Sequence, residues 1–193
     1  MEENKWIEKE LPNGDVFHLK ELFFYSENNE NKSIIPTIKP KIAIKITKVN
    51  EAMSSVVAYL THNEELVGFV ECKLYKDNKA ELNMASFMKS ILESQFGRVW
   101  PGAPAISTEE KFRRQGKGTI LLIILFEYLI NKGIYNINIH TIESDSAWKF
   151  YLENGATKID DMNAIFYDIK SLLPYLYAKV SNQIDISNSK FIK

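Results

Sequence analysis

The sequence predicts one domain of mixed α/β fold, in which a mixed sheet carries helices on both faces. Two observations lead to this prediction. From Lys41 onward, isoleucines alternate with lysine or alanine, and this period of two is typical of a half-buried strand. Ile120–Ile130 is an almost uninterrupted apolar run between glycine-containing turns, as expected of a buried helix. The order of elements is therefore strands, buried helix, strand, short helix, strand.

The first part of the chain gives the weakest local signals. We expect residues 1–40 to belong to the same domain, and within them Val16–Tyr25 could form an amphipathic helix. A strand is expected from Lys41 to Val49. Two β-rich runs follow, Ser55–Thr61 and Leu66–Tyr75, and the short polar stretch between them predicts an antiparallel hairpin.

The rest of the chain is predicted to form short strands and helices. Ala80–Ser94 is either a strand passing into a helix or a helix throughout, because its apolar residues have no decisive period. The remaining expected elements are a strand end at Ala105–Thr108, a strand at Ile134–Ile142, a helix that stops at Asn154-Gly155, a last strand at Ala164–Ile169, and a helix at Ser171–Val180. Ser181–Lys193 is predicted to be a polar, mobile tail. The domain proper would thus span 41–170, and 171–193 would hold the C-terminal helix and the tail.

Composition excludes several classes of protein. The 193 residues are 45% hydrophobic and 25% charged, as in a soluble domain with a sizeable core. The net charge is -1 and the basic residues are dispersed, so nucleic acid is not an expected partner. The lone Cys72 rules out an internal disulfide, and no basic and apolar leader opens the sequence, so we expect a cytoplasmic protein. The apolar run is shorter than the about 20 residues that cross a membrane.

The segment from Arg113 to Thr119 reads Arg-Arg-Gln-Gly-Lys-Gly-Thr and lies between a strand end and the buried helix. Glycines allow a sharp turn, and the amides at a helix start favour an anion such as phosphate. A P-loop would need glycine at Lys111 and Ser or Thr at Gly118. A dinucleotide-binding turn would need glycine at Leu121. Neither pattern is present.

The spacing that is present, Arg113-x-x-Gly116-x-Gly118, resembles the phosphate-binding motif of the GNAT superfamily of acyl-coenzyme A-dependent N-acetyltransferases. The segment 144–156 is similar to the family's second signature, an Asn-x-x-Ala-x-x-Phe-Tyr helix that ends in glycine. Its matching residues are Ala147, Phe150, Tyr151 and Gly155, and Ser144 stands where the family usually has asparagine. The resemblance implies a GNAT-like, mostly antiparallel sheet flanked by helices, with the N-acetyltransferase domain at 41–170.

The resemblance also implies how coenzyme A would bind. Backbone groups of Ile106–Thr108 would pair with the pantetheine arm, and the amide region of Ser107 or Thr108 would polarise the thioester carbonyl. The glycine turn would bind the pyrophosphate, while Arg113 could instead hold the turn through a carboxylate and Lys117 would point to solvent. The residues expected to bind acetyl-coenzyme A are Ile106, Ser107, Thr108, Arg113, Arg114, Gln115, Gly116, Lys117, Gly118, Thr119, Ser144 and Ala147. No metal is expected.

Tyr151 is the expected catalytic residue, because it matches the family's tyrosine that protonates the departing thiolate. The alternative is a core aromatic, since Tyr151 follows Trp148 by three residues on one helix face. No titratable side chain occurs from Val99 to Thr108, where many relatives carry a general base. His140 and Glu71 are fallback candidates, each with a structural role as the alternative, and water could also relay the proton.

The sequence therefore favours an N-acetyltransferase that transfers an acetyl group from acetyl-coenzyme A to an amine. The amine could belong to a protein lysine, an N-terminus, a polyamine, an aminoglycoside or an amino sugar. A second hypothesis is a non-catalytic acyl-coenzyme A sensor or scaffold, and a third is an interaction module that binds a partner protein through residues 1–40. We expect a monomer or homodimer without a membrane partner.

Overall fold

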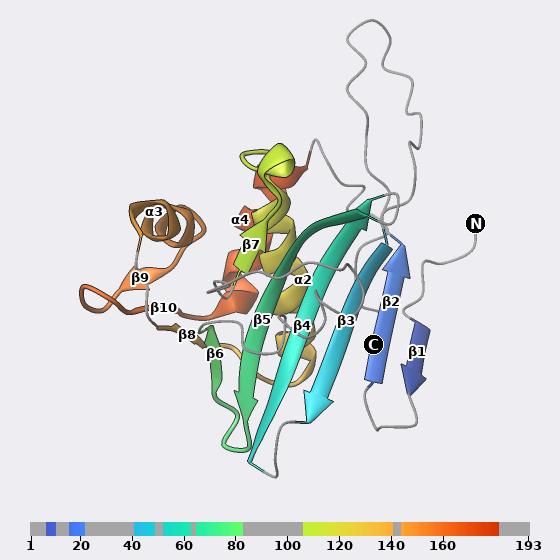
Figure 1. Ribbon diagram of the computed structural model, residues 1–193. Coiled ribbons are helices and arrows are strands. Elements are labelled where there is room, and N and C mark those ends of the chain that lie inside the picture. The colour runs from blue at the N-terminus through green and yellow to red at the C-terminus, as the bar shows by residue number, and fades with distance from the viewer. Residues whose placement is uncertain are drawn as a thin grey trace, which may run out of the picture.

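The computed structural model describes residues 7–10, 16–21, 41–48, 52–62, 65–82, 106–140 and 144–181. Ten strands form one sheet in the order β1-β2-β3-β4-β5-β6-β8-β10-β9, with β7 attached through β5 (Figure 1). The strands are β1 (Ile7–Glu10), β2 (Val16–Glu21), β3 (Lys41–Lys48), β4 (Met53–His62), β5 (Glu65–Tyr75), β6 (Ala80–Leu82), β7 (Ile106–Thr108), β8 (Ile137–Ile139), β9 (Thr157–Lys158) and β10 (Ala164–Phe166). The helical elements are η1 (Glu110–Phe112), α2 (Lys117–Asn131), α3 (Asp145–Glu153) and α4 (Ile169–Val180).

The mixed, mostly antiparallel fold is confirmed, with β6–β8 as its parallel pair among the described strands. The strand from Lys41 and the β4–β5 hairpin are confirmed as well. The helix expected at Val16–Tyr25 is wrong, because Val16–Glu21 forms β2 between β1 and β3. β3 pairs with the whole of this segment and β1 with Val16–Leu19, and pairing of this kind overrides local helix propensity. Residues 22–25 lie outside the described part.

Other boundaries shift by a few residues. β6 confirms a strand at the start of Ala80–Ser94, and the remainder of that segment lies outside the described residues, as do 182–193. The strand expected at Ile134–Ile142 is paired only at Ile137–Ile139. The last strand ends at Phe166 rather than Ile169, because Asp168 adopts a left-handed conformation (φ 43°) and donates its N–H to Asn136 Oδ1 at 3.0 Å. This turn starts α4 at Ile169, two residues before the expected helix.

Two short strands, β6 and β7, pair with the same edge of β5. β4 covers one edge of β5, so β6 and β7 share the other edge, at opposite ends of β5 (Figure 1). β6 pairs at Lys73 and Leu74, whereas β7 pairs at Gly68 to Val70. Both run antiparallel to β5, and the chain between them, 83–105, lies outside the described residues. β6 continues the sheet to β8, but β7 does not.

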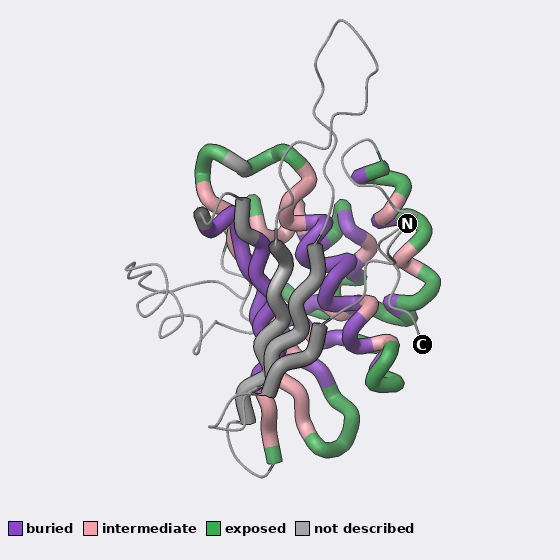
Figure 2. The backbone as a smooth tube through the Cα atoms, turned by 90° about the vertical axis from the view of Figure 1, so that its right-hand side faces the viewer, coloured by how far each residue is buried: buried purple, intermediate pink, exposed green. Residues whose placement is uncertain are grey.

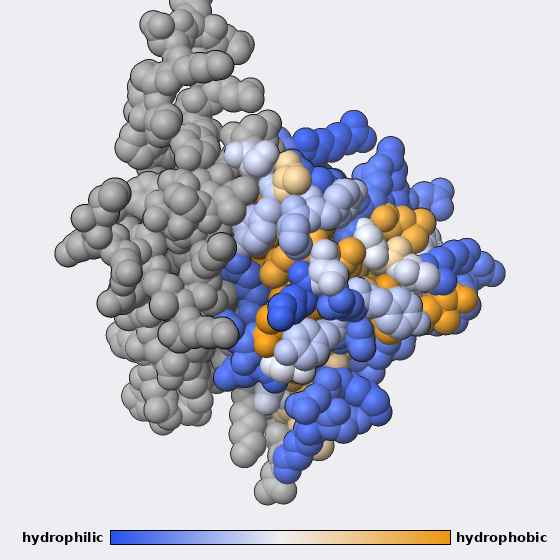
Figure 3. All heavy atoms as spheres, turned by 180° about the vertical axis from the view of Figure 1, so that it is seen from behind, coloured by the Kyte–Doolittle hydropathy of each residue, from blue (hydrophilic) through white to orange (hydrophobic). Residues whose placement is uncertain are grey.

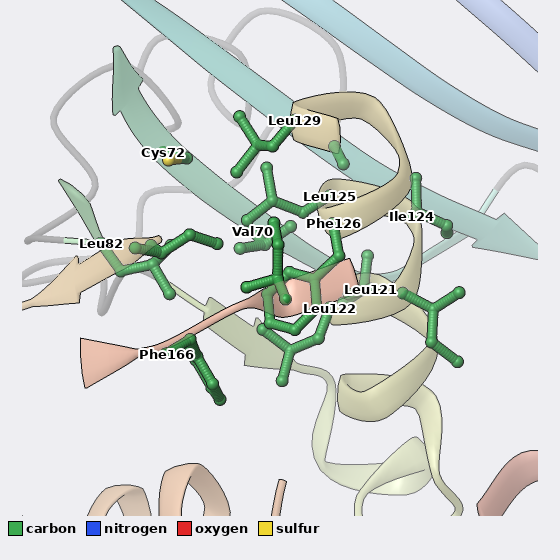
Figure 4. Close-up of a cluster of buried hydrophobic side chains, with 14 of the residues drawn as sticks. Val70, Cys72, Leu82, Leu121, Leu122, Ile124, Leu125, Phe126, Leu129 and Phe166 are labelled. Atoms are coloured by element: carbon green, nitrogen blue, oxygen red, sulfur yellow. The ribbon is translucent and has the colours of Figure 1, made fainter. Parts of the chain in front are cut away.

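The core forms where α2 packs against β4 and β5 (Figure 4). Buried residues cover nearly the whole circumference of α2, because α4 packs on it away from the sheet. Phe126 of α2 meets Phe166 of β10 edge to face, with ring centroids 5.0 Å apart. Figure 2 shows the buried segments gathered between the described strands and helices. This packing fixes the start of α2 relative to β7 and α3.

The surface shows a different pattern. Large apolar side chains are exposed at Tyr135, Leu152, Ile159, Met162, Tyr167 and Tyr175. On the face seen in Figure 3, apolar residues of the described part are interspersed with hydrophilic ones, which is ordinary for a water-exposed surface. Among the described helices, none combines the length and apolar character needed to span a bilayer.

A buried hydrogen bond between Thr119 and Asn154 ties the start of α2 to the end of α3. Thr119 Oγ1 donates to Asn154 Oδ1 at 3.0 Å, and Asn154 Nδ2 donates to the Phe150 carbonyl at 2.7 Å. Asn154→Ala should lower the free energy of unfolding by about 1–3 kcal/mol, because it leaves the Thr119 hydroxyl buried without this partner. Adding Thr119→Val should recover part of that loss in chemical denaturation. Equal stability of parent and Asn154→Ala would contradict this role.

Candidate functional site

The sheet splits between β7 and β8. The parallel pairing of β6 with β8 ends where the His140 N–H donates to the Leu82 carbonyl at 2.9 Å. Beyond this bond, the next strand along the edge of β5 is β7, and its one partner among the described strands is β5. Among the described strands, the outer edge of β7 therefore has no partner, at the point where the sheet divides.

Strand register determines which backbone groups face that open edge. Glu109 N–H donates to the Val67 carbonyl at 2.8 Å, so this pair is hydrogen-bonded. In an antiparallel ladder such pairs alternate, which directs the N–H and C=O of Ser107 at Phe69. Those of Ile106 and Thr108 point away from β5 instead. Of the two amides expected to polarise a carbonyl, this geometry favours Thr108 over Ser107.

The glycine turn brings β7 to the start of α2, and the expected order of strand, turn and helix is confirmed. Arg114 (φ 60°) and Gly116 (φ 72°) both adopt the left-handed conformation, which glycine accepts at low cost. Gly116 is the N-cap residue of α2 and has no side chain to cap it. The first amides of α2 have no intrahelical acceptors, and the first turn contains no acidic side chain. This helix start can receive an anion.

The side chains of the turn have different surroundings. Arg113 Nε donates to the Thr108 carbonyl at 3.2 Å, so Arg113 ties the turn to β7 through a carbonyl. Gln115 Nε2 donates to the Lys111 carbonyl at 2.9 Å, and Arg114 is exposed. Lys117, expected in solvent, is half-buried, and this burial lowers the pKa of its ammonium group. Of the basic side chains in this turn, the exposed Arg114 guanidinium is therefore the best placed to attract an anion.

The second glycine of the turn allows α3 to approach α2. A Cβ added at Gly118 would lie 2.8 Å from Phe150 Cε2, which is closer than van der Waals contact allows. Thr119, next along the helix, uses its hydroxyl to bind Asn154. Both residues therefore hold the two helices together, and only their backbone groups are left for an anion.

Ser144 is the N-cap residue of α3. Its Oγ accepts the Ala147 N–H at 3.2 Å and lies 3.2 Å from Ser146 Oγ. Serine is among the best N-cap residues, so it satisfies the helix start in the position where the resembling family usually has asparagine. The helix predicted to end at Asn154-Gly155 is confirmed, with Gly155 at φ 94°.

Tyr151 has an aromatic ring packed in the core and a hydroxyl that has no hydrogen-bond partner among the described residues. It is 5% exposed, and its ring lies 5.5 Å from that of Phe150 and 6.2 Å from that of Phe166. Within the described part of the chain, its hydroxyl makes no hydrogen bond. Burial raises the pKa of this hydroxyl, so it stays protonated at neutral pH. A buried hydroxyl without a protein partner is costly, and a water molecule or a ligand can supply the missing bond.

The fallback bases have contrasting environments. Glu71 is 1% exposed and accepts the Ser55 hydroxyl at 3.1 Å, so its carboxylate belongs to the interior. His140 has a side chain 38% exposed, with Nδ1 2.9 Å from Asn163 Oδ1 and Nε2 3.7 Å from Glu81 Oε1. Cys72 is buried, and burial raises the pKa of its thiol, in keeping with a small apolar residue.

Sequence reasoning missed three residues that surround His140, namely Glu81, Asp160 and Asn163. They lie on or beside β6 and β10, and pairing of those strands with β8 brings them to His140. Their separation along the chain leaves no local motif. Only a correct pairing of these three strands could have identified them.

A comparison with protein families agrees with the sequence motifs. The model of the acetyltransferase (GNAT) family matches residues 18–156. Among solved structures, the chain is similar to PaiA N-acetyltransferase from Thermoplasma acidophilum in complex with coenzyme A, with 20% identity, a TM-score of 0.41, and coverage of 57% of this chain and 58% of that one. It is also similar to BjaI, a coenzyme A-dependent acyl-homoserine lactone synthase with SAM and isopentyl-CoA, with 14% identity, a TM-score of 0.42, and coverage of 66% and 64%.

A third similar structure is a cAMP-binding acyltransferase from Mycobacterium smegmatis, with 10% identity, a TM-score of 0.39, and coverage of 93% of this chain and 56% of that one. The chain thus spans less than two thirds of the length of each of these three proteins. No curated protein matches its sequence.

Gly68 sets how closely β7 approaches β5. A Cβ added there would lie 2.5 Å from the Ser107 carbonyl oxygen and 2.9 Å from Thr108 Cγ2. Gly68→Ala should lower the free energy of unfolding by about 1–3 kcal/mol and speed amide exchange of Glu109, because β7 must move outward. Thr108→Ser in the same chain should not restore stability, since the nearest atom belongs to the backbone. Unchanged stability and exchange in Gly68→Ala would show that β7 is not held this closely.

Proposed function

Because this chain belongs to the acetyltransferase (GNAT) family, we propose that it transfers an acetyl group from acetyl-coenzyme A to an amine. The observation that carries the proposal is the open outer edge of β7. It begins where β6 and β8 separate, and it leads through the glycine turn to the uncapped start of α2. A long ligand with amides at one end and phosphates at the other would match the backbone groups of β7 followed by the amides at the start of α2.

Coenzyme A fits the residues that are present. Outward N–H and C=O groups of Ile106 and Thr108 would bond the pantetheine amides as an added strand does, although the Thr108 carbonyl also accepts from Arg113 Nε. The amides at the start of α2 would bind the pyrophosphate, helped by the helix dipole and the charge of Arg114. Gly116 keeps a side chain away from that approach. Ser144 and Ala147 at the start of α3 would border the other side of the split.

The proposed reaction needs a polarised carbonyl, a neutral amine and a proton for the leaving thiolate. The amine nitrogen attacks the thioester carbon, so a C–N bond forms and the C–S bond breaks. An outward N–H of β7 that is not used by the pantetheine arm is suited to stabilise the carbonyl oxygen as it gains charge. The electron pair of the C–S bond leaves with sulfur, and Tyr151 donates its proton to that thiolate. The nitrogen loses one proton, and the products are an N-acetyl amide and free coenzyme A.

A second candidate function is coenzyme A binding without turnover. It is favoured by Ser144, whose hydroxyl is engaged in capping α3, and by the lack of a titratable side chain from Val99 to Thr108. Thiol release with a panel of amines separates the two functions. An enzyme releases coenzyme A with at least one amine, whereas a sensor or scaffold is stabilised by acetyl-coenzyme A and releases none.

Acetyl-coenzyme A should raise the melting temperature of the folded protein, because a ligand that binds the native state stabilises it by about 2.7 kcal/mol at 100 times its Kd. Gly116→Val should abolish this shift by placing a side chain where the phosphate approaches. Gly133→Val is the matched control, since Gly133 has a similar φ of 75° at the other end of α2 and would be equally strained. The assignment fails if millimolar acetyl-coenzyme A leaves the parent's melting temperature unchanged.

Tyr151→Phe should reduce turnover by about 10²–10⁴-fold and leave coenzyme affinity nearly unchanged, because a general acid acts in the transition state. The substitution keeps the ring contacts with Phe150 and Phe166 and removes only the unsatisfied hydroxyl. The free energy of unfolding of Tyr151→Phe should therefore be equal to or higher than that of the parent. If the Phe variant keeps parental turnover while chemistry limits the rate, Tyr151 is a packing residue.

A further inference from the structure

His140 lies where the sheet divides. Its backbone N–H makes the bond at which the pairing of β6 with β8 ends. Its side chain is on the face of the sheet away from α2, because the alternation along β8 turns Ile137 and Ile139 into the core. The imidazole is partly exposed, so a solute that reaches this face of the sheet can approach it.

Asp160 and Asn163 fix the tautomer of this imidazole. The Asn163 side chain donates through Nδ2 to both carboxylate oxygens of Asp160 at 2.8 Å. These bonds lower the pKa of Asp160, so the carboxylate stays ionised at neutral pH. They also turn the Asn163 Oδ1 atom toward His140 Nδ1, 2.9 Å away. A carbonyl oxygen only accepts hydrogen bonds, so Nδ1 carries the hydrogen and Nε2 keeps its lone pair.

Glu81 supplies a negative charge near that lone pair. Glu81 Oε1 lies 3.7 Å from His140 Nε2, which is too far for a good hydrogen bond but close enough to stabilise an imidazolium. The other carboxylate oxygen accepts the Tyr75 hydroxyl at 2.8 Å, and this bond raises the pKa of Tyr75. The titratable groups around the imidazole are thus Glu81 from β6, Tyr75 from β5 through Glu81, and Asp160 through Asn163.

We propose that His140 Nε2 is the catalytic base of the reaction, with Asp160 and Asn163 as positioning residues. This inference rests on the proposed function. The acceptor nitrogen gives its surplus proton to Nε2 as the C–N bond forms, and Glu81 stabilises the resulting imidazolium. Tyr151 protonates the thiolate that leaves. Solvent then takes the proton from His140 and returns one to Tyr151, so the protons balance.

Glu71, the other fallback base, is less suited to this role. It is 1% exposed and binds Ser55, which is itself fully buried. An amine would have to enter the interior to reach it. His140 needs no such opening, because its side chain is already partly exposed.

The experiment is the pH dependence of turnover at saturating acetyl-coenzyme A, with two amines of different pKa. The parent should give one inflection that both amines share, because the enzyme's imidazole takes the proton. His140→Gln should lower turnover about 10²–10⁴-fold at neutral pH, keep the acetyl-coenzyme A melting shift, and give profiles that follow each amine's own pKa. Added imidazole should restore part of the activity of His140→Ala.

The positioning residues have a matched pair of variants. Asp160→Asn should move the inflection, because Asn163 is then free to turn its amide. Asp161→Asn should not, since the Asp161 carboxylate binds exposed Lys158 at 2.9 Å. In the parent, ¹⁵N spectra of the imidazole should show the hydrogen on Nδ1, and Asp160→Asn should reduce that preference.

Two failures are distinguishable. Parental turnover and a parental inflection in His140→Gln would overturn the role of His140 and leave the proposed function in place. Stabilisation by acetyl-coenzyme A without thiol release from the parent, for any amine in the panel, would contradict the proposed function, and the role of His140 would fall with it.

Discussion

The architecture of the site depends on how one edge of β5 is used. β6 and β7 share that edge, and β8 pairs with β6 alone. The sheet must therefore divide where β6 ends, which leaves the amide and carbonyl groups of Ile106 and Thr108 without strand partners in the described sheet. Such an edge binds an extended polar chain readily. His140 lies at the point where the sheet divides. The chain continues from β7 directly into the glycine turn.

Contacts between α2, α3 and α4 hold the elements around the division of the sheet in place. Gly118 lets Phe150 pack closely, and the Thr119 hydroxyl binds Asn154 at the end of α3. α4 then satisfies the carbonyl of Glu153, which accepts from the Tyr175 hydroxyl at 2.9 Å and Lys179 Nζ at 2.7 Å. These polar groups at the junction of the three helices are thus paired, whereas the Tyr151 hydroxyl has no hydrogen-bond partner among the described residues.

Local patterns predicted the parts of the site that are continuous in sequence. The glycine turn, the buried helix and the capped α3 each depend on residues within one short segment, so their chemistry is readable from spacing. The local pattern suggested a helix at Val16–Tyr25, but Val16–Glu21 is a strand, because its strand partners are elsewhere in the chain. For the same reason the sequence could not show which amides of β7 face outward, or that Asn163 and Glu81 meet at His140. Those facts follow from register and from pairing between distant strands.

The central claim is that coenzyme A binds along the outer edge of β7 and at the start of α2. The most direct test follows backbone amide signals of ¹⁵N-labelled protein during titration with coenzyme A. The account predicts large shifts and slower exchange for the Thr108 amide and for the amides from Gly116 to Thr119. The Ser107 amide, which faces β5, should keep its exchange rate. Binding that protects Ser107 and Thr108 alike, or that leaves both the Thr108 and the α2 amides unchanged, would contradict the account.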